Sequence, residues 1–151
     1  YSGDDLSIIL EMFEAFEEYW LSGYMYEFGL DTPLDRPSSA KASGLCHVHV
    51  LYNEELFTDN DYREWERKSS PNIPPSLRSK RMNCDSMIIY SMSREGTALF
   101  LTFYPSLGHE RIKHGTVELG NLAIVSEDYF SSIDENPASY EEVMEFLQQP
   151  T

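Results

Sequence analysis

Apolar side chains recur every three or four residues in the first part of the chain. This spacing predicts a helix over Asp4–Tyr26 that carries its acidic residues on the other face. The next stretch, residues 31–44, contains two prolines, three serines and one glycine. Because these residues interrupt both helical and strand periodicity, we expect a loop or an extended crossing there.

Strict alternation of side chains predicts a strand over Leu45–Tyr52. Cys46 and the valines of this segment face one side, whereas His47 and His49 face the other, about 7 Å apart along the strand. Residues 53–80 are polar and uneven, and we expect them to form a long excursion.

Two apolar segments, residues 87–92 and 98–104, predict a second and a third strand. The link between them contains Gly96, which favours a hairpin. Beyond the hairpin, residues 109–130 predict a strand fragment followed by a helix from about Val117.

The end of the chain predicts one more helix. Residues 131–137 resemble a linker, and Ser139 is placed to cap an acidic helix over Tyr140–Leu147. We therefore divide the chain into one domain over residues 1–130 and an appended acidic linker and helix over residues 131–151.

The composition indicates a folded and strongly acidic protein. Of the 151 residues, 41% are hydrophobic and 13% aromatic, enough for one compact domain with a real core. The 11 basic and 26 acidic residues give a formal net charge of −15, which argues against broad binding to nucleic acid or to an anionic membrane. The chain has only two cysteines, no secretory signal pattern and no apolar run of the ~20 residues that span a bilayer. We expect a cytoplasmic protein without membrane association.

The charges are distributed unevenly along the chain. Residues 1–30 contain seven acids and residues 115–151 contain eight, and neither segment has a Lys or Arg. Residues 63–114, in contrast, hold nine basic residues against five acids. Such asymmetry indicates a localised anion site on an acidic body, unless the clustering in sequence is lost on folding.

The histidine pair of the first predicted strand has three interpretations. His47 and His49 can bind a metal, grip and titrate against a phosphate, or line the wetter face of a sheet. A metal site needs further ligands, and the remaining histidines, His109 and His114, lie on a segment without a metal-ligand motif.

A second candidate group follows the third predicted strand. His109 comes directly after it, with Arg111, Lys113 and His114 close behind. Cleavage of an RNA phosphodiester uses such residues, because a base deprotonates the 2′-hydroxyl, an acid protonates the leaving 5′-oxygen and cations balance the phosphorane charge. A turn histidine with nearby surface charges is the alternative.

Further basic and aromatic residues can contact RNA. Arg78, Lys80 and Arg81 precede a strand, and Tyr90 and Tyr104 offer rings on which bases can stack, although strand tyrosines also serve as cross-strand packing partners. The chain lacks a P-loop, a dinucleotide fingerprint and a Gly-x-Ser-x-Gly motif, which disfavours NTPases, dehydrogenases and common hydrolases.

From about Leu21 to Phe130 the order of these pieces resembles the YafO-type toxins of bacterial type II toxin–antitoxin systems, which are relatives of RelE-like ribosome-dependent endoribonucleases. The pieces that carry the resemblance, in order, are Phe28-Gly29, Cys46–Val50 with its His-x-His pair, Arg81–Tyr90 with its Arg-x-Asn, Leu99–Phe103, Pro105 followed by His109, and Leu122–Phe130.

This resemblance implies an α+β fold, in which N-terminal and C-terminal helices pack on one face of a small antiparallel sheet. It also implies cleavage of mRNA in the ribosomal A site without a metal or cofactor, and suppression by a cognate antitoxin. Carried over by position, His109 or His49 transfers protons, and Arg81 and Arg111 balance phosphate charge. The remaining residues are expected to bind RNA: His47, Arg78, Lys80, Tyr90, Lys113 and His114.

Two other function classes remain open. A non-catalytic interaction protein, such as an inhibitor or immunity factor, would keep this fold and use its acidic helices to cover a basic partner. A metal hydrolase built on His47 and His49 is a weaker option. Convergence of the histidines with Arg81 and Arg111 within about 10 Å would favour the enzyme. We also expect the acidic tail to fold over or beside the basic surface, because opposite charges attract within a Debye length of ~8 Å.

Overall fold

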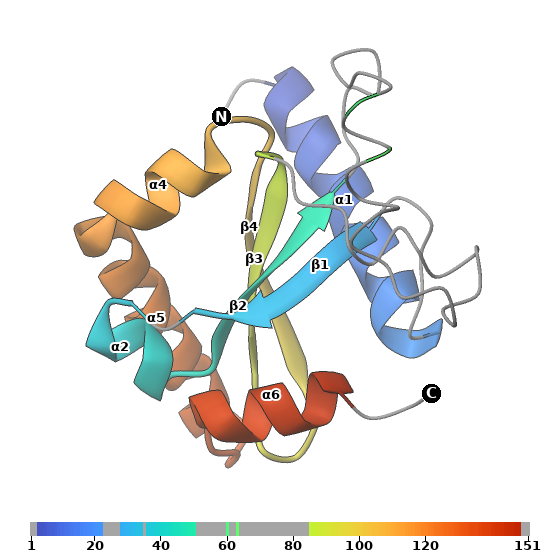
Figure 1. The fold of residues 1–151 in the computed structure, drawn as a ribbon. Coiled ribbons are helices and arrows are strands. Elements are labelled where there is room, and N and C mark those ends of the chain that lie inside the picture. The colour runs from blue at the N-terminus through green and yellow to red at the C-terminus, as the bar shows by residue number, and fades with distance from the viewer. Residues whose placement is uncertain are drawn as a thin grey trace.

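The structure, a computed structural model, describes residues 3–22, 28–34, 36–50, 60, 63 and 85–148. A four-stranded antiparallel sheet, ordered β1-β2-β3-β4, stands between helices on both sides (Figure 1). The α+β class is therefore confirmed, but the helices cover two faces of the sheet instead of one. The elements are α1 (Gly3–Ser22), β1 (Phe28–Pro33), α2 (Ser38–Ala42), β2 (Leu45–Val50), β3 (Met87–Met92), β4 (Ala98–Tyr104), α4 (Gly108–His114), α5 (Thr116–Ser132) and α6 (Tyr140–Gln148).

The loop expected over residues 31–44 is wrong in part, because this region contains the end of β1 and the short helix α2. β1 pairs only with β2, so it is an edge strand of the described sheet. Pro33 is its last residue, a position where the missing backbone donor is tolerated. Tertiary pairing with β2 thus makes a strand of a sequence that lacks strand periodicity.

The three predicted strands are confirmed. β2 ends at Val50, and the rest of the predicted strand lies outside the described residues, as does almost all of the expected excursion over residues 53–80. β3 and β4 form the predicted hairpin, with a register shift between Ile89 and Tyr90. All six residues of β3 are buried, as expected for a central strand covered on both faces.

One face of the sheet packs against α1 and α6. Its core is rich in aromatic rings, and the Phe16 ring lies 4.9 Å from the Tyr90 ring, centroid to centroid. The hydroxyls of Tyr19 and Tyr90 both donate to the Asp31 carboxylate, at 2.7 Å. The buried members of this core are Phe16, Tyr19, Phe28, Cys46, Val48, Val50, Ile88, Tyr90, Met92, Phe103, Ala138 and Val143.

The other face is covered by α2, α4 and α5 (Figure 1). Leu45, Leu119 and Ala123 form one small apolar cluster there, and Met87 and Tyr104 belong to a second one. The strand fragment expected after residue 109 is wrong, since α4 occupies that segment, whereas the helix expected from about Val117 is confirmed as α5. Among the described helices, none is long and apolar enough to cross a membrane.

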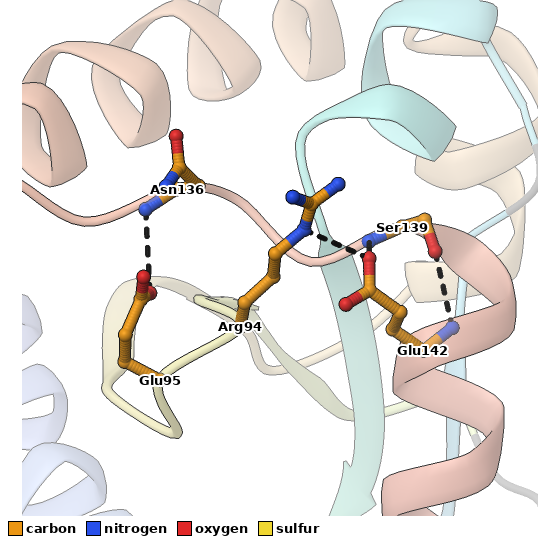
Figure 2. Close-up of polar contacts among 5 residues, drawn as sticks. All are labelled: Arg94, Glu95, Asn136, Ser139 and Glu142. Atoms are coloured by element: carbon orange, nitrogen blue, oxygen red, sulfur yellow. Dashed lines mark hydrogen bonds and ion pairs between the residues drawn. The ribbon is translucent and has the colours of Figure 1, made fainter.

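The acidic tail helix is confirmed as α6, together with its predicted cap. The Ser139 hydroxyl accepts a hydrogen bond from the Glu142 backbone N–H, and the Ser139 N–H donates to the Glu142 carboxylate, both at 3.1 Å (Figure 2). This reciprocal pair is a capping box. Arg94, in the β3–β4 turn, donates to the same carboxylate at 3.0 Å.

The tail packs on the same face of the sheet as α1. Val143 is fully buried in that core, so α6 is packed onto the domain that residues 1–130 were expected to form alone. Among the described basic residues of the central segment, Arg94 forms an ion pair with the tail. Arg111 and Lys113 lie on α4, which packs on the opposite face of the sheet.

Candidate active site

Three histidines from two distant segments come together on the face of the sheet covered by α4 and α5. Alternation along β2 puts His47 and His49 on this side, with ring centroids 5.1 Å apart. α4 brings His109 to the same place, where its ring lies 5.2 Å from that of His49. The three predicted residues therefore form one cluster, which we call the histidine cluster.

Close backbone contact between α4 and the start of β3 sets the position of His109. The Gly108 N–H donates to the Asp85 carbonyl oxygen at 2.8 Å. A Cβ atom at Gly108 would lie 2.5 Å from that oxygen and 2.6 Å from the Met87 methyl group, so only glycine permits this approach. Leu107, at φ 57°, turns the chain into α4 immediately before it.

Asp85 holds the imidazole of His109. Its Oδ1 lies 2.5 Å from His109 Nδ1, and the side chains are 57% and 48% exposed, respectively. An ionised carboxylate can only accept, so Nδ1 carries the hydrogen and Nε2 keeps its lone pair when the ring is neutral. The pairing of Asp85 with His109 was not predicted, because 24 residues separate the two along the chain and no local pattern links them.

His47 and His49 lie deeper than His109. His49 is buried to 1% exposure, and His47 is partly buried. Burial, followed by the nearby charges of His49 and His109, lowers the pKa of His47 to about 3. His47 therefore stays neutral at physiological pH and cannot supply a proton or a positive charge there.

The polar contacts of His47 are weak. Its Nε2 lies 3.5 Å from Thr32 Oγ1, and its buried Nδ1 has no hydrogen-bond partner within the described part of the chain. The cluster therefore has the neutral, largely buried His47 at its bottom and the half-exposed His109 at its rim.

Arg111 places positive charge near the cluster. Its guanidinium carbon lies 4.1 Å from the centroid of the Tyr104 ring, and its Nη2 lies 3.5 Å from the Glu118 carboxylate. Tyr104 is the register partner of Met87, which is in turn the partner of His49. Two strand spacings therefore put Tyr104 about 10 Å from His49, and Arg111 borders the site.

The other predicted residues are not part of the cluster as described. Tyr90 was expected to stack on a base, but it is fully buried on the α1 face and donates to Asp31, so this prediction is wrong. Lys113 and His114 are exposed at the end of α4 and remain candidates for RNA contact. Arg78, Lys80 and Arg81 lie outside the described residues.

Within the residues that the structure describes, no group of three or more His, Cys, Asp or Glu side chains could hold a metal ion. His109 is half-exposed and packs against the buried ring of His49, an arrangement that suits proton transfer at an anionic substrate.

Comparison with known proteins gives one match. The model of the family described as "Toxin YafO, type II toxin-antitoxin system" matches residues 14–131. This range includes the histidine cluster, Asp85 and Arg111. No curated protein and no solved structure matches the chain significantly.

Proposed function

The chain belongs to the YafO toxin family of type II toxin–antitoxin systems, and we propose that this toxin is an endoribonuclease that cleaves mRNA in the context of the ribosome. Membership in a type II family implies a cognate antitoxin as its partner. The observation that carries the proposal is the convergence of Asp85, His109 and His49 from three separate segments.

The proposed reaction starts at the 2′-hydroxyl of the message. His109 is the proton acceptor, because its ring is half-exposed and the bond from Nδ1 to Asp85 fixes the tautomer in which Nε2 is the basic nitrogen. The freed 2′-oxygen attacks the adjacent phosphorus, the bond to the 5′-oxygen breaks, and that oxygen takes up a proton from solvent. The products are a 2′,3′-cyclic phosphate and a 5′-hydroxyl end.

The remaining residues act around this step. Asp85 is a positioning residue, since it fixes the ring orientation and the tautomer of His109. His49 is buried against the His109 ring and supports it from below. Arg111 borders the site and can balance the charge that develops on the phosphorane.

The net charge of −15 supports a role for the ribosome. Phosphate contacts dominate the affinity of most nucleic-acid binders, and an acidic chain gains little from them at long range. A ribosome that presents the message would remove the need for strong capture of free RNA. In this proposal the protein cleaves the message, and the ribosome holds the message in position.

The test compares induced expression of wild type, His109→Ala and Glu110→Ala. We expect wild type and Glu110→Ala to arrest growth and cleave mRNA, and His109→Ala to do neither. Glu110 is the matched control, because it is the exposed neighbour of His109 on the same helix and has no proposed role in RNA binding or cleavage. Purified protein should cleave an mRNA with ribosomes present and spare it without them.

Other outcomes would change the interpretation. If His109→Ala is as toxic as wild type, the proposed role of the cluster is wrong. If wild type is harmless and cleaves no RNA at all, the non-catalytic interaction protein becomes the better explanation of this fold.

A further inference from the structure

α1 carries a stripe of exposed apolar side chains on the face turned away from the core. Leu6 and Leu10 are 52% and 54% exposed, Phe13 is 42% exposed and Leu21 is 83% exposed. Their spacing puts them along one side of the helix, over ~22 Å at 1.5 Å per residue. Helices in monomeric proteins usually bury such a stripe, so this one points to an interaction surface.

The stripe borders a hollow between α1 and the edge strand β4. This hollow has a volume of about 240 Å³ and is lined by Phe13, Phe16, Glu17, Trp20, Leu21, Ala98 and Phe100. The rings of Phe13 and Phe100 meet edge to face at 5.7 Å and form part of its wall. β4 pairs only with β3 within the described sheet, so the far side of this wall is a sheet edge.

A second hollow lies between the β3–β4 turn and α6. It has a volume of about 290 Å³, and Glu95, Glu145 and Phe146 are among its lining residues. Trp20 lines the first hollow and contacts two lining residues of the second, because its Nε1 donates to the Gly96 carbonyl at 3.3 Å and its ring stacks on Phe146 at 5.5 Å. We call the apolar stripe and these two hollows together the α1 groove.

The charge around the α1 groove is negative. Glu17 lines the first hollow, and Glu95, Glu142 and Glu145 line the second. Among the described residues that line the two hollows, Arg94 is the one basic residue, and it is already paired with Glu142 (Figure 2).

The exposed acids of α1 extend this negative field. Glu14 and Glu18 project from the helix beside Glu17, and no Lys or Arg lies anywhere in residues 1–30. An occupant of the groove therefore meets apolar contacts flanked by carboxylates, which outnumber the cations among the described residues of the groove.

We infer that the α1 groove binds an amphipathic helix of the cognate antitoxin that has an apolar face flanked by Lys and Arg. The apolar stripe has the i, i+4, i+7 spacing against which a helix can pack, and the flanking carboxylates select a cationic partner. This inference rests on the toxin role, and it predicts that the antitoxin segment in the groove is positively charged.

The position of the groove separates docking from chemistry. α1 packs on the face of the sheet that carries Tyr90, whereas the histidine cluster lies on the face covered by α4 and α5. A helix in the α1 groove therefore anchors the antitoxin without contacting His109. Binding and cleavage can be measured independently for this reason.

The experiment uses the full chain with His109→Ala, so that the toxin can be produced without RNA cleavage. The probe is a fluorescent synthetic helix of about 18 residues, long enough for the stripe, with leucines on one face and lysines beside them. A matched peptide has glutamates in place of the lysines. Fluorescence anisotropy measures the affinity of each peptide.

We expect the lysine peptide to bind and the glutamate peptide to bind at least about tenfold more weakly. Leu10→Ser should weaken the lysine peptide by about tenfold, because it removes most of one buried leucine contact. Glu17→Lys should weaken it by about threefold to tenfold. The matched controls on α5, Ile124→Ser and Asp128→Lys, should leave binding unchanged; Ile124 is 56% exposed, like Leu10.

Three results would overturn this inference. The first is equal binding of the two peptides or no binding of either. The second is a loss of affinity in the α5 variants instead of the α1 variants. The third is a dimer of the chain alone that Leu10→Ser dissociates, since the groove would then belong to a second copy. None of these depends on cleavage, whereas a chain that binds the probe but is inert toward mRNA would count only against the ribonuclease proposal.

Discussion

The two faces of the sheet use the same strands for different purposes. On the α1 face, β2 and β3 contribute Cys46, Val48 and Tyr90 to an aromatic core, and the polar group enclosed there, Asp31, receives two tyrosine hydroxyls. On the α4 face, the intervening residues of β2 are His47 and His49. A buried polar group whose hydrogen bonds are satisfied stabilises a fold, whereas a half-exposed titratable group such as His109 is accessible to a substrate.

The difference shows in the protonation of the buried groups. Burial and the charge of Asp31 raise the pKa of Tyr90 well above its ordinary value, so the hydroxyl remains a hydrogen-bond donor at every physiological pH. On the other face, burial lowers the pKa of His47 and keeps it uncharged. Substitutions on the α1 face should therefore change stability, and substitutions at the rim of the α4 face should change activity.

The largest effect is expected from Asp85→Asn. An amide can turn its NH₂ toward Nδ1 and favour the wrong tautomer of His109, so kcat for mRNA cleavage should fall by about tenfold to a thousandfold, with KM little changed. Asp85→Glu should restore part of the rate because it keeps the carboxylate. Cleavage kinetics with ribosomes measure this; an unchanged kcat in Asp85→Asn would contradict the positioning role.

Tyr90→Phe is expected to lower stability without affecting cleavage. It removes one of two hydroxyls that donate to Asp31 and should reduce the free energy of unfolding by about 1–3 kcal/mol. Tyr129→Phe, at a residue 38% exposed on α5, is the control and should change it by less than about 0.5 kcal/mol. Urea denaturation gives both values. A folded Tyr90→Phe protein with impaired cleavage would break the division between the two faces.

The neutral state of His47 predicts a pH dependence of stability. Its folded pKa of about 3 lies below the ordinary unfolded value of ~6.5, so the unfolded chain binds the extra proton as the pH falls. The stability that depends on neutral His47 is fully present above about pH 6.5. The free energy of unfolding should be lower by about 2 kcal/mol at pH 5. His47→Gln should remove this slope. Urea denaturation of both proteins at pH 7 and pH 5 tests it, and parallel slopes would show that His47 is not responsible.

The smallest effect is expected at the N-terminus of α6. Ser139→Ala removes the hydroxyl that accepts from the Glu142 N–H and should cost about 1 kcal/mol. Ser131→Ala, at an exposed position near the end of α5, is the control. Thermal unfolding measures the difference, and equal melting temperatures would show that the capping box contributes nothing to the folded domain.

Local patterns in the sequence were sufficient for most elements. Period-two alternation identified β2, and apolar runs joined by a glycine-containing turn identified the β3–β4 hairpin. β1 could not be found in this way, because Asp31 and Pro33 have poor strand propensity and become strand residues only by pairing with β2. α4 was missed because it is a single short helix whose alternating charges resemble a strand.

Local patterns also identified part of the candidate site. Strand periodicity alone is enough to put His47 and His49 on one face, because a strand alternates its side chains with a period of two. The residue types also identified His109 and Arg111 as candidates. The order of the sequence motifs indicated the resemblance to the YafO toxins.

Which of these candidates lie close together depends on the packing of the whole fold. The fold brings Asp85 to His109 and buries Tyr90 on the face opposite the histidine cluster. It also leaves an apolar groove flanked by acidic residues along α1. The physical reason is distance along the chain: periodicity fixes the direction of neighbouring side chains, whereas contacts between segments tens of residues apart depend on how the sheet and helices pack.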